Sequence, residues 1–138
     1  MNCIFCDIIE RRSPAEIVFE NEKAIAFLDI KPIHPGHTLV VPKQHFDQYV
    51  HIPPDYYHDV MTAIHHVTDS ILKTYSPDGY NMFTSNGRAA GQSVFHVHFH
   101  VTPRYFNDKI SFRLQLKSYL AGEMQSTAEK LRAHIPSS

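Results

Sequence analysis

Three histidines alternate with apolar residues in the stretch V-F-H-V-H-F-H-V-T-P-R, which spans residues 94–104. On an extended strand, His96, His98 and His100 would share one face, and the residues between them would point into the core. Such a row of imidazoles can coordinate a metal, form a polar strand face, or include a nucleophile. A neutral imidazole, whose ordinary pKa is about 6.5, is mostly a free base at neutral pH and can attack phosphorus without prior deprotonation.

These three interpretations are not equally well supported by the rest of the chain. A polar strand face accounts for one histidine more readily than for three in strict alternation. Zinc catalysis would need a third protein ligand and a carboxylate base, but no H-E-x-x-H or H-x-x-E-H pattern is present, and Asp29 is the one acid in the loops expected nearby. Phosphoryl or nucleotidyl transfer fits better, because Gly91, Gln92 and Ser93 precede the row and can offer backbone N–H groups and polar side chains to a phosphate.

The composition is that of one soluble domain. The chain has 138 residues, 43% of them hydrophobic and 20% charged, with a formal net charge of −1. This balance gives no indication of a nucleic-acid partner or an anionic membrane surface. No apolar run approaches the roughly 20 residues of a membrane span, and charged residues come too early for a signal peptide. With two cysteines only, we expect a reduced, cytoplasmic protein rather than a disulfide scaffold.

The elements that must position the histidines can be read from periodicity and turn residues. Alternating or buried apolar runs predict strands at 17–20, 24–28, 38–42, 80–85, 95–102 and 112–116. Helices are expected at 6–12, from 53–55 to 75, and at 120–135, the longest of them ending at Ser76-Pro77-Asp78-Gly79. Strands grouped around one long helix predict an α+β domain with a mostly antiparallel sheet.

At this point the chain resembles the histidine-triad (HIT) family. Residues 96–102 match the family signature His-φ-His-φ-His-φ-φ, in which φ is apolar, and Thr102 is the one departure. Residues 27–30, 35–43 and 86–94 also resemble the family, in the same order along the chain. The resemblance covers about 3–104 and leaves 105–138 as a C-terminal segment. It implies a single HIT domain over 1–138, with about five mostly antiparallel strands, one long helix and a C-terminal helix.

The resemblance also implies a mechanism. His98, the middle histidine, would attack the α-phosphorus of a nucleoside monophosphate ester, anhydride or amidate and form a nucleotidyl-histidine intermediate, which water then hydrolyses. A main-chain carbonyl would hold the proton on its Nδ1 and leave Nε2 free. His100 would contact the phosphate, and Gln92 and Ser93 would bind the phosphate or the scissile bridging atom and help the leaving group depart.

Other positions are assigned to the nucleotide by the same resemblance. Asp29 would accept hydrogen bonds from the ribose hydroxyls, although an aspartate before Pro32 is also an ordinary turn residue. His37 matches a histidine near the triad and would support it. The remaining nucleotide-binding positions are the apolar walls Ile8, Phe27 and Ile30, together with Asn86 and Gly91 of the pre-strand loop.

The pair Cys3-x-x-Cys6 has its own interpretation. On its own it could be redox-active, zinc-binding or incidental, and no β-α-β context indicates a thioredoxin motif. Structural zinc needs four ligands. Resemblance to a bacterial and protozoal, Hint-like branch of the family implies that His45 and His96 supply the other two. The expectation is a closed Cys2His2 zinc site, with no catalytic metal.

The sequence leaves the leaving group of the substrate open. Val101-Thr102-Pro103-Arg104 stands where the Hint-like subgroup has a glycine pair, so the leaving group could be an amine, a carboxylate or a phosphate. The resemblance implies a hydrolase of purine nucleoside phosphoramidates or adenylates. The alternatives are a dinucleoside polyphosphate hydrolase and a purine-nucleotide-binding interaction module with weak activity. It also implies a homodimer, joined through the helix at 57–75 and a sheet edge, with no nucleic-acid or membrane partner.

Overall fold

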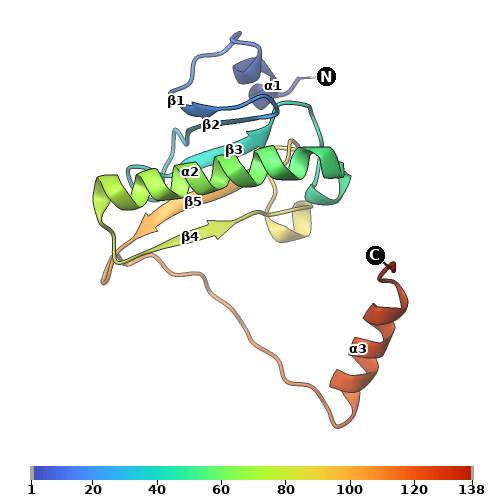
Figure 1. Ribbon diagram of the computed structural model, residues 1–138. Helices are drawn as coiled ribbons and strands as arrows, with labels where there is room; N and C mark the ends of the chain where they lie inside the picture. The colour runs from blue at the N-terminus through green and yellow to red at the C-terminus, as the bar shows by residue number, and fades with distance from the viewer. Residues whose placement is uncertain (1, 138) are drawn as a thin grey trace.

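A five-stranded sheet in the order β1-β2-β3-β5-β4 forms the centre of the structure, a computed structural model that describes residues 2–137 (Figure 1). Every neighbouring pair of strands is antiparallel. The strands are β1 (Ile17–Glu20), β2 (Ala24–Leu28), β3 (Thr38–Pro42), β4 (Gly79–Phe83) and β5 (Phe99–Arg104). The helices are α1 (Ile4–Ile9), α2 (Tyr57–Tyr75) and α3 (Glu123–Ala133), with the short 3-10 helices η1 (Tyr49–His51), η2 (Pro54–Tyr56) and η3 (Arg88–Ala90). The predicted α+β class is confirmed.

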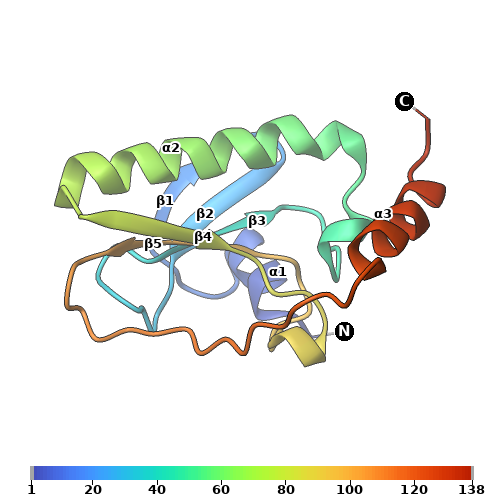
Figure 2. The same ribbon diagram turned by 90° about the horizontal axis from the view of Figure 1, so that it is seen from below.

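Helices cover both faces of this sheet, α2 on one side and α1 on the other (Figure 2). Alternate residues of the central strands therefore enter two separate apolar clusters. Against α2 lie Ala24, Ala26, Val40 and Val101, packed on Val60, Ala63, Ile64, Val67 and Ile71. Against α1 lie Ile25, Phe27, Leu39 and Val41, packed on Phe5 and Ile8. Burying each of these larger side chains contributes roughly 1.5–3 kcal/mol, so α1 is fixed to the sheet by its own core contacts.

Helix α1 begins two residues earlier than the expected 6–12 and is shorter. The reason is at its N-terminus, where the Sγ atom of Cys3 accepts the backbone N–H of Cys6 at 3.4 Å and caps the helix. It ends where Arg11 adopts a left-handed conformation with φ 61°. The cap places both cysteines at one end of the helix.

Strand β5 begins later than the expected 95–102, so that prediction was wrong for the first two histidines of the row. β5 pairs with β3 only from Phe99 onward, opposite Val40. Before it, the backbone N–H of Val97 donates to the carbonyl of Phe46 at 2.8 Å, outside the sheet ladder. His96 and His98 therefore lie on an irregular segment that leads into the strand, while Val97 and Val101 are buried as expected.

The strand expected at 112–116 is also absent: the structure has no strand between 105 and 122, and this arm leads in extended form to α3 (Figure 1). The alternating apolar residues have no partner strand, and Leu114 and Leu116 are 76% and 88% exposed. Phe112 lies against the ring of Phe83, with the ring centroids 5.9 Å apart. None of the helices in residues 2–137 combines the length and the apolar character that a membrane span requires.

Candidate active site and metal centre

A hollow of about 280 Å³ opens on the sheet face that α1 covers. One part of its wall is apolar and comes from α1, β2 and the residues after β2; the other part is polar. Seven of the residues assigned to the nucleotide by sequence line it: Ile8, Phe27, Ile30, Asp29, Ser93, His98 and His100. A larger hollow, of about 440 Å³, lies between α2 and the sheet but contains no member of the triad. Chemistry rather than size therefore identifies the candidate active site.

The proton of His98 is placed by a main-chain contact. Its Nδ1 lies 2.8 Å from the carbonyl oxygen of His96, and since a carbonyl only accepts, Nδ1 carries the hydrogen and donates it. Nε2 then keeps a free lone pair, as the sequence interpretation expects. The ring of Phe5 stands edge-on to the imidazole, with centroids 5.1 Å apart, and the side chain is buried. The ring is thus held in one orientation, and in its neutral form Nε2 is the nitrogen that could act as a nucleophile.

The proton of His100 is placed by a relay of two hydrogen bonds. The backbone N–H of Ile33 donates to Nδ1 of His37 at 3.0 Å, so His37 must carry its hydrogen on Nε2, which lies 3.0 Å from Nδ1 of His100. His100 therefore accepts on Nδ1 and carries its own hydrogen on Nε2. That N–H is a donor suited to a phosphate oxygen. The ring is also stacked on Phe83, with centroids 4.4 Å apart and an interplanar angle of 8°.

Burial keeps this relay uncharged. It lowers the pKa of His100 to about 4, helped by the neighbouring His98 and His37. Burial also lowers the pKa of His37, although the carboxylate of Asp29 acts in the opposite direction. Both rings are therefore neutral at neutral pH, and the donor and acceptor roles above hold there.

Asp29 lies half-buried at the edge of the hollow. Its Oδ1 accepts the backbone N–H of Lys31 at 2.9 Å, and its Oδ2 lies 3.7 Å from Nε2 of His37. The loop returns to β3 through Gly36, which has φ +99° and where a Cβ would meet the ring of Tyr75 at 2.5 Å. Only glycine suits this turn, and the turn brings Asp29 and His37 to the same place.

Asp29, His37 and His100 also have ligand atoms close enough for a metal, but their protonation does not suit one. The Nδ1 lone pair of His37 accepts the N–H of Ile33, and Nε2 carries the proton. A neutral imidazole has one lone pair, so His37 has none left for a cation. This cluster fits a hydrogen-bond relay better than a metal site.

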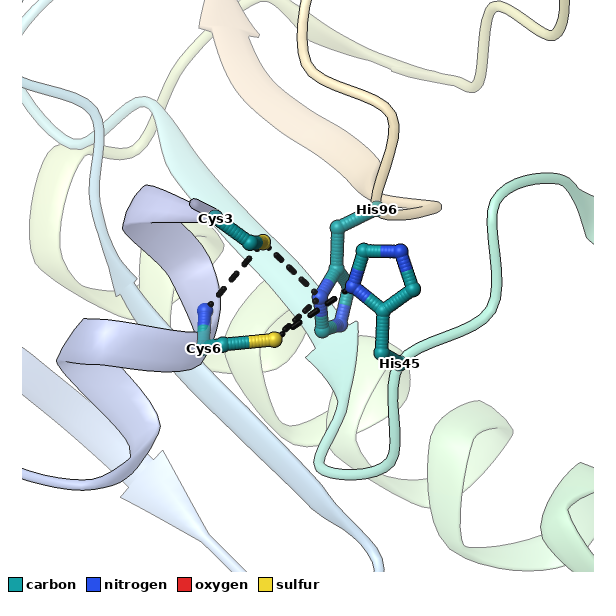
Figure 3. A group of neighbouring side chains, drawn as sticks. All are labelled: Cys3, Cys6, His45 and His96. Atoms are coloured by element: carbon teal, nitrogen blue, oxygen red, sulfur yellow. Dashed lines mark hydrogen bonds between the residues drawn. The ribbon is translucent and has the colours of Figure 1, made fainter. Parts of the chain in front are cut away.

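A second cluster does suit a metal. The ligand atoms of Cys3, Cys6, His45 and His96 all lie within 4.8 Å of one another (Figure 3). Sγ of Cys3 is 3.5 Å from Nδ1 of His96, and Sγ of Cys6 is 3.3 Å from Nδ1 of His45 and 3.6 Å from Nδ1 of His96. In a tetrahedral zinc site the sulfur and nitrogen ligands stand about 3.5 Å apart. The four predicted ligands therefore have the composition and spacing of a Cys2His2 site.

The hydrogen bonds around the cluster prepare both histidines as ligands. Nε2 of His96 donates to the carbonyl of Pro42 at 2.8 Å, and Nε2 of His45 donates to Oδ1 of Asp47 at 2.8 Å. Both Nδ1 lone pairs are thus left for a cation, which is the usual outer arrangement of a metal-binding histidine. Burial and the adjacent Cys3 raise the pKa of the Cys6 thiol to about 11, so a bound cation would have to displace its proton.

The loop before the triad differs from expectation in two side chains. The amide of Gln92 is buried and fully engaged: Oε1 accepts the N–H of Gly87 at 2.8 Å, and Nε2 donates to the carbonyls of Asp47 and Val94 at 2.7 and 3.0 Å. Asn86 likewise accepts the N–H of Tyr49 and donates to Thr84.

Neither of these amides lines the hollow, so both hold the loop rather than reach into the site. Gly91 supplies a left-handed turn with φ 95°, and Ser93 is the exposed loop residue at the hollow.

Sequence reasoning missed several residues that hold the site together. Phe5 lies between the two cysteines in sequence and packs against both His96 and His98; its place in C-I-F-C was the available signal. The accepting carbonyl of Pro42 and the N–H of Ile33 left no signal, because main-chain groups are present at every residue.

Comparison with known proteins agrees with the geometry. The HIT domain family matches residues 10–107 of this chain. An uncharacterized HIT-like protein of Methanocaldococcus jannaschii is 47% identical over 106 residues, covering 77% of this chain and 81% of that protein. An adenosine 5'-monophosphoramidase of Candida albicans is 41% identical over 108 residues, covering 75% of this chain and 70% of that protein.

Solved structures give the same result. A member of the HIT family from Bacillus subtilis superposes with a TM-score of 0.93 at 33% identity, covering 100% of both chains. A zinc-bound histidine triad family protein from Mycobacterium smegmatis superposes with a TM-score of 0.75 at 33% identity, covering 96% of this chain and 97% of that one. With matches that extend over most of its length in sequence and in structure, this chain belongs to the histidine-triad (HIT) family.

Proposed function

We propose that this protein is a nucleotide hydrolase that cleaves purine nucleoside phosphoramidates or adenylates through a nucleotidyl-His98 intermediate. The observation that carries the proposal is the hydrogen bond from Nδ1 of His98 to the carbonyl of His96. This hydrogen bond leaves the lone pair of Nε2 free, and His98 lines the hollow. Membership of the HIT family and the phosphoramidase activity named for the Candida albicans relative support the same reaction class.

The residues around His98 suggest how the substrate is held. The purine base packs against Phe27 and Ile8, which are buried, and against Ile30, which is 90% exposed and available to cover it. Asp29 accepts hydrogen bonds from the ribose hydroxyls. The Nε2–H of His100 donates to a phosphate oxygen, a contact that grows stronger as charge develops in the transition state.

The reaction then takes two displacements at phosphorus. Nε2 of His98 forms a bond to phosphorus while the bond to the leaving group breaks, and the leaving group departs with the electron pair and takes up a proton from solvent beside Ser93. Water then attacks the nucleotidyl-histidine and returns a proton to solvent, the P–N bond to His98 breaks, and the nucleoside monophosphate is released. Gln92, Gly91 and Asn86 contribute by shaping the loop that presents Ser93.

Zinc held by Cys3, Cys6, His45 and His96 is part of the proposal as a structural group, without a catalytic metal. The fit of the four ligand atoms supports it, as does the zinc-bound relative. Zinc would supply a cross-link between the start of α1 and the segment before β5. The free thiols Cys3 and Cys6 suit a reducing, cytoplasmic compartment.

The assembly we propose is a homodimer formed through α2 and the edge strand β4. β4 lies at the end of the sheet, and its Tyr80 and Met82 are 45% and 48% exposed. On α2, Tyr57 and Met61 are 52% and 65% exposed. An apolar edge strand beside an apolar helix face is suited to pairing with a second copy.

Turnover of adenosine 5'-phosphoramidate tests the proposed function. We expect AMP release by the wild type, a fall of at least about 10³-fold in kcat/KM for His98→Ala, and little change in AMP affinity. His134→Ala, which changes an exposed histidine at the end of α3, is the matched control and should behave like the wild type. If His98→Ala still releases AMP at the wild-type rate, the mechanism is wrong. If the wild type binds AMP but releases none from the amidate, the protein is a binding module.

A further inference from the structure

A second hollow adjoins the one that holds the triad. It has a volume of about 520 Å³, and its wall includes Asn2, Asp47 and Phe95 beside the metal ligands Cys3 and His45. Three residues, Ile4, Ser93 and Val94, line both hollows. The two spaces therefore meet along one rim formed by the start of α1 and the end of the pre-triad loop.

The first hollow is already accounted for by the nucleotide part of the substrate. Its apolar wall takes the base, Asp29 takes the ribose, and His98 and His100 face the phosphate. In a displacement at phosphorus the leaving atom lies roughly in line with the attacking atom and on its far side. The rest of the leaving group must then extend beyond the phosphate, and Ser93, which belongs to both hollows, marks the passage into the second.

The charge of the second hollow indicates what it accepts. Oδ1 of Asp47 accepts from His45, while Oδ2 makes no hydrogen bond to any residue in 2–137, and the side chain is 56% exposed. A bound Zn²⁺ would neutralise two cysteine thiolates, and apart from the metal ligands the carboxylate of Asp47 is the one charged side chain among the residues that line this space. The guanidinium of Arg88 lies 5.7 Å from the ring centroid of Phe95, but Arg88 is not among the residues that line the space.

We propose that this second hollow is the subsite for the leaving group, and that it takes an organic amine carrying a further positive charge in preference to a phosphate chain. The inference rests on the proposed function and adds the leaving-group class to it. A cation near Asp47 is attracted, whereas a polyphosphate brings negative charge to a negative wall. Phe95 offers an aromatic surface to the carbon chain of the amine.

Two adenosine phosphoramidates that differ in one group test this. One is made from an alkylamine and the other from a diaminoalkane of the same chain length, so that only the second ends in an ammonium group. We expect the wild type to favour the ammonium compound in kcat/KM by about threefold to fivefold, the size of an exposed ion pair. In Asp47→Asn the preference should vanish. AMP affinity and zinc content should stay at wild-type levels, because an asparagine oxygen can still accept from His45.

Asp69→Asn removes an acid of the same kind from α2, which lines neither hollow, and should keep the preference. Equal kcat/KM for the two compounds in the wild type, or an unchanged preference in Asp47→Asn, would overturn the subsite. The subsite would also be overturned if the wild type cleaved a dinucleoside polyphosphate faster than either phosphoramidate and Arg88→Gln lost this advantage, because Arg88 would then set the specificity. Failure to release AMP from either amidate would be a failure of the proposed function itself and would remove both.

Discussion

The main-chain carbonyl of His96 accepts the Nδ1 proton of His98, while the side chain of His96 turns away into the cysteine–histidine cluster. One residue thus belongs to the candidate metal centre through its ring and contacts the proposed nucleophile through its backbone. Two histidines that look equivalent in sequence have different contacts, and the main-chain carbonyl of one holds the Nδ1 proton of the other.

Zinc binding can be tested by exchanging histidines. His45→Gln removes a ligand whose Nδ1 lies 3.3 Å from Cys6 Sγ, and we expect bound zinc to fall from one per chain to near zero. The midpoint of thermal unfolding should fall by about 5 °C or more, because the cross-link between α1 and the triad segment is lost. His51→Gln, outside the cluster, is the control. Metal analysis and calorimetry measure both; full zinc retention by His45→Gln would contradict the ligand set.

The relay through His37 can be tested by a side chain that copies its hydrogen bonds. Glutamine can accept the N–H of Ile33 through its oxygen and donate to His100 through its nitrogen, whereas leucine can do neither. We expect His37→Leu to lose about tenfold in kcat/KM, in line with one buried hydrogen bond, and His37→Gln to recover most of it. Steady-state kinetics with adenosine 5'-phosphoramidate measure kcat/KM for both variants. Equal activity in the two variants would mean that the relay does not position His100.

The buried amide of Gln92 is expected to act on the loop rather than on the phosphate. Gln92→Leu keeps the volume but leaves the N–H of Gly87 and the carbonyls of Asp47 and Val94 without partners. We expect a loss of about 2 kcal/mol or more in the free energy of unfolding and faster hydrogen exchange at the Gly87 amide. A variant with normal stability and exchange but slow turnover would instead assign Gln92 a direct contact with substrate.

Acid should destabilise the fold through His100. Burial lowers its pKa to about 4 in the folded protein, against about 6.5 in an unfolded chain. Below about pH 6.5 the unfolded state therefore binds the extra proton, and stability falls until the folded state also binds it near pH 4. The contribution lost is at most about 3 kcal/mol.

This contribution can be separated from metal loss by working with metal-free protein. Urea unfolding of the wild type and of His100→Gln, both with chelator, should give a stability difference that shrinks from about pH 7.5 to about pH 5. A difference that stays constant over that range would show that His100 is not held neutral by burial.

Much of this architecture could be predicted from sequence because its signals are local. The apolar runs at 24–28 and 38–42 became β2 and β3 with the expected bounds, and the helical spacing up to Tyr75 became α2. The four proposed zinc ligands come together although His45 and Cys6 are 39 residues apart. Here the resemblance to a family supplied what spacing alone could not.

What could not be predicted depends on partners that periodicity does not reveal. Residues 112–116 alternate like a strand, but no neighbouring strand pairs with them. The row of histidines alternates too, yet Val97 bonds to Phe46 rather than to β3, so β5 starts only at Phe99. Gln92 is a polar residue before the triad, and only the structure shows that its amide is fully hydrogen-bonded to main-chain groups.

Helix α1 connects the candidate zinc site with the hollow proposed to bind the nucleotide. Cys3 and Cys6 at its start face the cation site, while Phe5 and Ile8 on the same short helix face the nucleotide hollow. Whatever holds α1 in place for one ligand also prepares it for the other, and linkage requires the two effects to be equal in free energy. If both ligands bind as proposed, a bound nucleotide should therefore lower the dissociation constant of zinc by the same factor by which zinc lowers that of the nucleotide.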